Sequence, residues 1–230
     1  MKSICIIPAR GGSKRIPRKN VKDFLGKPII AYSIEAARQS GVFDEVMVST
    51  DDEEIAEIAK RYGASVPFMR SAETSNDFAS TADVIIEVLK QYEQIDKTFD
   101  IVACIYATAP FINANIIREG INSIAEKGYE AAMTCVEFSY PILRSLVIDK
   151  ENRISMKWPE FKNSRSQDLG KFYHDAGQFY VAKTETYKKS RSFSGNNTAP
   201  IVLSELYVQD LDTPTDWKIA EIKYSLMTNQ

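Results

Sequence analysis

Residues 4–20 read ICIIPARGGSKRIPRKN, and this stretch indicates the type of fold. The apolar, β-favouring run Ile4–Ile7 stops at Pro8, and a loop with Gly11 and Gly12 follows. A buried strand that leads into a flexible cationic loop is typical of an open α/β sheet that presents N–H groups and positive charge to phosphates. The stretch therefore predicts a nucleoside triphosphate as ligand. The cations of the loop are Arg10, Lys14, Arg15, Arg18 and Lys19.

The loop matches neither of the two common phosphate-binding fingerprints. A Walker A loop ends in Gly-Lys-Ser/Thr, whereas here Ser13 precedes Lys14. The dinucleotide fingerprint needs a third glycine where this chain has Arg15, which disfavours an NAD(P)-dependent reductase. A basic segment can also be a solvated surface without a specific ligand, but glycines and prolines between the charges favour a phosphate site.

Composition limits the class of protein. A chain of 230 residues fits one domain over 1–230 with a substantial core. The net charge of −2 gives no general attraction to nucleic acid, and no apolar run approaches the roughly 18 residues of a membrane span. Cys5, Cys104 and Cys135 each lie in an apolar run, which predicts buried, reduced thiols and a cytoplasmic protein.

Strands and helices alternate through the first two-thirds of the chain. Apolar runs predict strands at 3–8, 45–49, 65–68, 101–106 and 130–137. Helical periodicity and capping residues predict helices at 28–40, 52–61, 80–94 and 113–126. This order predicts an α/β fold with a doubly wound, mainly parallel sheet that binds ligands at the carboxyl ends of its strands.

The alternation stops between about 138 and 175. This range contains Tyr140-Pro141, Trp158-Pro159 and a polar run at 162–171, and we interpret it as an excursion inserted into the sheet domain. Strands at 178–181 and 201–208 and a helix at 213–227 are expected to complete the chain.

Asp210 and Asp212 are candidate metal ligands. They share one side of an extended segment, because side chains alternate along it. Two hard carboxylates without soft ligands nearby suit Mg²⁺. The alternative is that Asp212 or Thr213 only caps the following helix. The basic loop favours the metal site, since a triphosphate needs a divalent cation to balance its charge.

Other candidates carry weaker signals. Asp51–Glu54 suits the N-terminus of a helix, and of these residues Asp51 is kept as a functional candidate because it lies nearest the strand end. The aromatic stretch 172–180 is either core beneath a loop or the wall of a pocket for a hydroxylated substrate. For that substrate, Arg144 or Arg165 is available to bind a carboxylate.

Several motifs together resemble one enzyme family. They are similar to motifs of the cytidylyltransferases that activate eight- and nine-carbon keto-sugar acids as CMP-sugars. The motifs follow in the order of the family and span nearly the whole chain. They are IPARGGSKRIPRKN (7–20), VSTD (48–51), the region of Arg70, TAP (108–110) and QDLDTPTDW (209–217).

The resemblance implies a Rossmann-like domain with a small dimerisation element at about 138–175, and hence a homodimer. It implies Mg²⁺ on Asp210 and Asp212, and catalytic roles for Arg10, Lys19 and Asp212. The nucleotide-binding residues that it implies are Ala9, Arg10, Gly11, Ser13, Lys14, Lys19, Asn20, Arg70 and Thr81.

The implied reaction is attack by the anomeric hydroxyl of a nine-carbon keto-sugar acid on the α-phosphate of CTP, without nucleic acid or membrane as partner. The combination of YHDAGQFY (173–180), SYP (139–141) and RSQD (165–168) resembles the pseudaminic acid branch. Legionaminic and N-acetylneuraminic acid remain alternatives, as does a nucleotide-binding regulator without catalysis. The candidate sugar-binding residues are Tyr106, Arg144, Arg165, His174, Gln178 and Tyr180.

Overall fold

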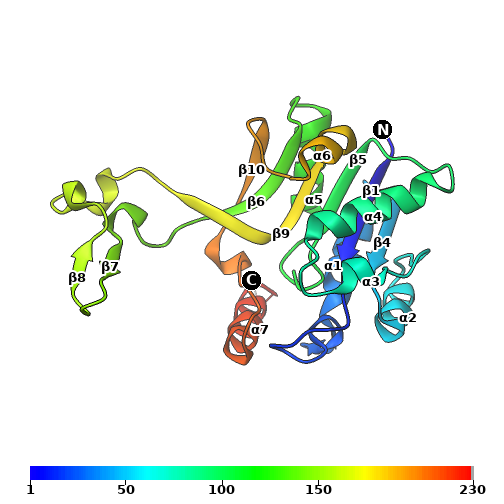
Figure 1. The fold of residues 1–230 in the computed structure, drawn as a ribbon, viewed down its shortest axis with the longest axis horizontal. Coiled ribbons are helices and arrows are strands. Elements are labelled where there is room, and N and C mark those ends of the chain that lie inside the picture. Colours follow the sequence, from blue (N-terminus) through cyan, green and yellow to red (C-terminus); the bar gives the residue numbers. More distant parts are fainter. Residues whose placement is uncertain (229–230) are drawn as a thin grey trace.

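A six-stranded sheet organises the chain in the computed structural model, which describes residues 1–228 (Figure 1). The strand order is β10-β6-β9-β5-β1-β4, and β9 alone runs antiparallel to its neighbours. The predicted doubly wound, mainly parallel sheet is therefore confirmed. The strands are β1 (Ser3–Pro8), β4 (Glu45–Ser49), β5 (Ile101–Ile105), β6 (Ala131–Glu137), β9 (Tyr173–Lys183) and β10 (Thr198–Leu203).

Helices cover both faces of this sheet. Alternate residues of β1 enter opposite cores: Cys5 and Ile7 join the layer of α1, α2 and α5, whereas Ile4 and Ile6 join the layer of α4 and α6. The helices are α1 (Ile29–Ser40), α2 (Glu53–Arg61), α3 (Ala72–Ser75), α4 (Thr81–Glu93), α5 (Ala114–Ala125), α6 (Thr184–Ser190) and α7 (Pro214–Thr228).

A third cluster holds α7 beside the loop that follows β1. The ring of Phe24, in the short hairpin β2 (Asp23–Phe24) and β3 (Lys27–Pro28), lies edge-on to Tyr32 of α1 and to Trp217 and Tyr224 of α7. Edge-to-face contacts between buried aromatic rings add to the stability that burial provides. The C-terminal helix α7 therefore packs against the hairpin that follows the glycine-rich loop.

Two predicted strands differ from the structure. The segment 65–68 forms only a single bridge, Met47 to Ser65, because Pro67 cannot donate to a ladder. The strand predicted at 201–208 lies at Thr198–Leu203 instead, and a 3₁₀ turn at Glu205–Tyr207 follows it. The strand predicted at 178–181 is the central part of β9. The sequence patterns did not indicate β2, β3, α3 or α6.

The irregular segment forms an arm that projects away from the sheet (Figure 1). It carries a small hairpin, β7 (Leu146–Ile148) and β8 (Ile154–Met156), flanked by 3₁₀ turns. The first residues of β9 already pair with β6, so the arm returns to the sheet at Tyr173, slightly earlier than predicted. Leu146, Ile148 and Ile154 are exposed on the hairpin.

The three cysteines are buried in the sheet and unpaired, as predicted. Burial raises the pKa of the Cys104 thiol, so it is a poor nucleophile at neutral pH. Within residues 1–228, no helix has the length and apolar character needed to cross a membrane. The cytoplasmic location stays a prediction.

Candidate active site

Two hollows meet at the carboxyl ends of the central strands, where open α/β sheets bind their ligands. One has a volume of about 450 Å³ and is lined by the cations of the loop after β1, so we call it the cationic hollow. The other has a volume of about 440 Å³ and is lined by Glu137, Asp175, Glu205 and Asp210, so we call it the acidic hollow. Both contain Tyr106 and Thr108, which directly follow β5. Tyr106 therefore marks the boundary between two chemically different sites.

Most of the predicted nucleotide-binding residues line the cationic hollow. Ala9 and Gly11 are not among its lining residues: Ala9 is buried and donates its N–H to Ser49 O at 2.9 Å, and the Gly11 N–H points to Asp51. The predicted residues that line it are Arg10, Ser13, Lys14, Lys19, Asn20, Arg70 and Thr81.

Hydrogen bonds fold the glycine-rich loop onto itself. Ser13 Oγ donates to the carbonyl of Ile16 at 2.6 Å, and Asn20 Nδ2 donates to the carbonyl of Arg10 at 2.9 Å. Lys19 Nζ donates to the Leu211 carbonyl at 2.8 Å, which links the loop to the segment that carries the two aspartates. Burial lowers the pKa of Lys19, and the neighbouring Asp212 and Asp210 carboxylates oppose that shift.

A carboxylate already holds two of the cations. Arg10 Nη1 donates to Asp77 Oδ1 at 2.8 Å, and Lys14 binds the other oxygen of the same carboxylate. The Lys14 ammonium and the Arg10 guanidinium lower the pKa of Asp77. A phosphate group that binds these cations must therefore compete with Asp77.

Arg70 is positioned by the end of β4. Its Nε donates to Ser49 Oγ at 3.1 Å and its Nη2 donates to Ser49 O at 2.6 Å, and burial lowers its pKa. A guanidinium fixed in this way is prepared to bind an anion without further ordering.

Asp210 and Asp212 do not cap α7. Asp216 Oδ2 accepts hydrogen bonds from the N–H and hydroxyl of Thr213, at 2.7 and 2.8 Å, and the Thr213 hydroxyl accepts from the Asp216 N–H at 3.2 Å. Thr213 is therefore the cap, one of the two alternatives in the sequence. Asp210 lines the acidic hollow, and Asp212 binds Arg15 and lies 4.0 Å from Lys19 Nζ.

Asp210 and Asp212 offer few ligands for a metal ion, but their carboxylates suit magnesium. Within residues 1–228, no group of three or more His, Cys, Asp or Glu side chains is arranged to hold a metal. Mg²⁺ commonly takes one or two carboxylates and completes its shell with water and substrate phosphate. Asp210 and Asp212, beside the cationic hollow, fit that pattern.

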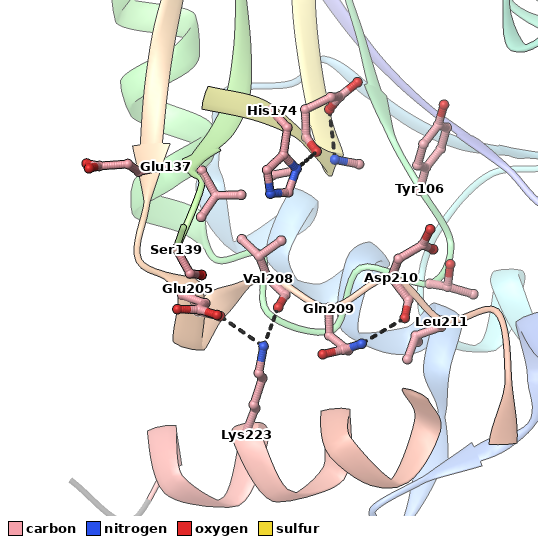
Figure 2. A pocket seen from close by; sticks show the side chains of 15 residues that line it. Tyr106, Glu137, Ser139, His174, Glu205, Val208, Gln209, Asp210, Leu211 and Lys223 are labelled. Atoms are coloured by element: carbon pink, nitrogen blue, oxygen red, sulfur yellow. Dashed lines mark hydrogen bonds between the residues drawn. The ribbon is translucent and has the colours of Figure 1, made fainter. Parts of the chain in front are cut away.

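The acidic hollow is lined from β6, β9 and the segment before α7 (Figure 2). His174 donates from Nδ1 to the carbonyl of Asp175 at 2.9 Å, and its ring lies against Phe138 with centroids 4.7 Å apart. Lys223 Nζ donates to the carbonyls of Glu205 and Val208, at 3.1 and 2.7 Å. This lysine ties α7 to the wall of the hollow.

The predicted sugar-binding residues are only partly brought together. Tyr106 and His174 line the acidic hollow, whereas Tyr180 lines a smaller aromatic hollow of about 200 Å³, which also contains Tyr106. Gln178 is buried and donates to Tyr207 O at 2.6 Å. Arg144 and Arg165 lie on the arm, where Arg165 pairs with Asp168, and they line none of these hollows.

A family model for cytidylyltransferases matches residues 4–212. The chain belongs to the cytidylyltransferase family. A pseudaminic acid cytidylyltransferase of Campylobacter jejuni is 44% identical to it over 98% of this chain and 97% of the relative. A CMP-N,N'-diacetyllegionaminic acid synthase of Legionella pneumophila is 33% identical over 96% and 95%. A solved CMP:2-keto-3-deoxy-manno-octonic acid synthetase in complex with CTP has the same fold, with a TM-score of 0.69, 20% identity and full coverage of both chains.

Three residues of this cytidylyltransferase site carried little signal in the sequence. Asp77 lies in a polar turn, and Lys223 lies in a helix without a distinctive pattern. Asp175 accepts the Gly177 N–H at 2.8 Å and the Tyr180 hydroxyl at 2.8 Å, so it connects the acidic and aromatic hollows. An Asp two residues before a Gly is an Asx-turn signal, which could have drawn attention to Asp175.

Proposed function

We propose that this protein transfers CMP from CTP to pseudaminic acid and releases pyrophosphate. The 44% identity to a pseudaminic acid cytidylyltransferase along nearly the full length supports this substrate. The observation that carries the proposal is the junction at Tyr106 and Thr108, where a cationic hollow suited to a triphosphate adjoins a hollow of different polarity.

The reaction joins two anions, so it requires charge neutralisation and alignment more than a covalent intermediate. The anomeric hydroxyl of the sugar attacks the α-phosphorus of CTP and forms a new P–O bond, and its proton passes to a nearby carboxylate or to water. The bond between the α-phosphorus and the oxygen that bridges to the β-phosphorus breaks, and pyrophosphate leaves. Arg10, Lys14 and Lys19 would bind the triphosphate and stabilise the charge that develops on the departing pyrophosphate. Ser13, Asn20, Arg70 and Thr81 would complete the nucleotide site.

Asp210 and Asp212 are proposed to hold Mg²⁺, which would neutralise phosphate charge when bound. Asp210 lines the acidic hollow, and Asp212 binds Arg15, which lines the cationic hollow, so their positions support this role. For Asp212 to do so, Arg15 must turn away from the carboxylate that it binds here.

The sugar is proposed to occupy the acidic and aromatic hollows, with Tyr106, His174 and Tyr180 in contact with it. Several carboxylates line the acidic hollow, and Lys223 is the one lysine or arginine among its described lining residues. A keto-sugar carboxylate placed there needs more positive charge. We propose that Arg144 or Arg165 supplies it from the arm of a second copy in a homodimer.

Legionaminic and N-acetylneuraminic acid are the alternative substrates. The 33% identity to a legionaminic acid enzyme supports the first of them less strongly than 44% supports pseudaminic acid.

A pyrophosphate-release assay with CTP, Mg²⁺ and a panel of nonulosonic acids tests the proposal. Pseudaminic acid should give the highest kcat/KM. A clear preference for another sugar acid would correct the substrate, and CTP binding without pyrophosphate release from any of them would identify a regulator instead.

A further inference from the structure

We propose that contacts between the glycine-rich loop after β1 and the segment 51–54 after β4 set the geometry of this loop. We call these contacts the clamp, and we propose that Arg18 is a positioning residue within it. The role of the loop rests on the proposed function. The clamp consists of Asp51 and Asp52, which lie between β4 and α2, of Glu54 in the first turn of α2, and of Gly11 and Arg18 near the two ends of the loop.

The clamp holds the start of the loop through its backbone. Asp51 Oδ1 accepts the Gly11 N–H at 2.9 Å. A Cβ added at Gly11 would lie 2.7 Å from Asp52 Oδ2, so a larger residue would push the Asp52 carboxylate away from this position. The two neighbouring aspartates therefore fix where the loop leaves β1.

The clamp holds the end of the loop through a side chain. The Arg18 guanidinium binds both carboxylate oxygens of Asp52, with Nη2 at 3.0 Å from Oδ1, and it also binds Glu54. A bidentate pair of this kind fixes direction as well as distance. Arg18 does not line the cationic hollow, so its charge serves the loop and not the ligand.

The backbone at Arg18 supports the same conclusion. Its φ of 54° and ψ of 30° are left-handed, a conformation that non-glycine residues hold only where their surroundings enforce it. Lys19 and Asn20 follow directly and line the cationic hollow. The turn of the chain at Arg18 therefore decides where these two side chains reach.

The clamp residues after β4 are anchored to the hydrophobic core through α2. Asp52 Oδ1 also accepts the Ile55 N–H at 3.0 Å, which caps α2, and α2 packs on the core through Ile55 and Ala59. The same carboxylate thus connects a helix that is anchored in the core to the end of the loop.

Binding measurements on the whole protein test the proposal. Isothermal titration of CTP, pyrophosphate and CMP, with Mg²⁺ and without sugar, would compare wild type with Arg18→Met, Asp52→Asn and the double variant. We expect Arg18→Met to weaken CTP and pyrophosphate binding by about tenfold or more, with a much smaller effect on CMP, because a displaced loop loses contacts to the β- and γ-phosphates. The double variant should bind CTP only slightly more weakly than either single variant, because each single variant already removes the same contact between Arg18 and Asp52.

Two further variants separate positioning from stability. Arg18→Gly removes the clamp but suits the left-handed backbone, so it should stay folded and still bind CTP weakly. Arg118→Met is the matched control, because Arg118 also makes several hydrogen bonds, to Ser40 O, Gln39 O and Asn115, on a helix outside the site. It should bind CTP as the wild type does.

Unchanged CTP binding in folded Arg18→Met and Arg18→Gly would overturn the clamp, and so would an equal loss for CTP and CMP. Wild-type protein that does not bind CTP would instead refute the proposed function. The absence of turnover with every sugar acid would leave the binding test of the clamp intact.

Discussion

Asp77 bridges Arg10 and Lys14, two cations that line the cationic hollow. The contact neutralises part of the charge that a triphosphate would meet, and the ligand must displace it. Because these side chains are partly exposed, the competition is weak, as it is for most surface ion pairs.

We expect Asp77→Asn to bind CTP more tightly, by about threefold to fivefold, because the competing charge is lost. Titration calorimetry at low and high salt checks this, and the gain should shrink at high salt. Glu73→Gln, an exposed change on the neighbouring α3, is the control. Unchanged or weaker binding in Asp77→Asn would contradict the competition.

We expect Asp210 to contribute to the turnover rate and not to the stability of the fold. Loss of one preorganised charge contact costs about 100- to 1,000-fold in rate, so Asp210→Ala should lose turnover to that extent at saturating Mg²⁺ while its melting temperature stays close to wild type. Asp44→Asn is the matched control, because Asp44 accepts the N–H and hydroxyl of Ser3 at the amino end of β1, away from the site, and should affect melting more than turnover. Wild-type turnover in Asp210→Ala would refute the metal assignment.

At the scale of elements, α2 and the loop after β1 are coupled through one carboxylate. Hydrogen bonding and charge from Arg18 lower the pKa of Asp52, and the Ile55 N–H at the helix cap acts in the same direction. A carboxyl group with a depressed pKa binds fewer protons in the folded state than in the unfolded state. Its contribution to stability is therefore present above the unfolded pKa and is lost as the pH falls.

The acid stability of Asp52→Asn should show this coupling. We expect wild type to exceed the variant in free energy of unfolding by a constant amount from pH 7 to about pH 5. The difference should decline as the pH falls through about 3.9 and below. Urea unfolding across this range measures it. A difference that persists unchanged at the lowest pH would show that Asp52 contributes by packing alone.

At the scale of the whole molecule, the arm extends away from the rest of its own chain. It projects from the sheet and ends in a short two-stranded hairpin (Figure 1). Leu146, Ile148 and Ile154 are exposed on this hairpin. An isolated hairpin is marginally stable in water, and clustered exposed apolar side chains commonly mark an interface. Both facts favour a second copy of the chain as the partner.

We expect Ile148→Lys to convert a dimer into a monomer and to reduce turnover strongly, because it places a charge in the proposed interface. Light scattering after size exclusion and the pyrophosphate assay measure the two effects. Val202→Lys is the matched control: Val202 is 55% exposed on the edge strand β10, and Ile148 is 68% exposed. A wild type that is monomeric and fully active would end the dimer proposal.

Much of the fold could be predicted from local patterns. The apolar run Ile4–Ile7 forms β1, Ser80 caps α4, and Gly63 follows the end of α2 with a φ of 90°. Each of these signals lies within a few residues of sequence, so the elements appear close to the predicted positions. The segment around Pro67 and the bounds of the edge strand β10 were harder to predict. Their pairing depends on neighbours that are distant in the sequence.

The sequence by itself determined the α/β alternation, the cationic loop after β1 and the aspartate pair after β10. It could not determine which cations face a ligand. Arg18 turns to Asp52, 34 positions away, and Lys14 to Asp77, 63 positions away. Such pairs exist only after the sheet has brought the carboxyl ends of its strands together. Tertiary structure therefore decided that Lys19 lines the hollow whereas the adjacent Arg18 holds the loop in place.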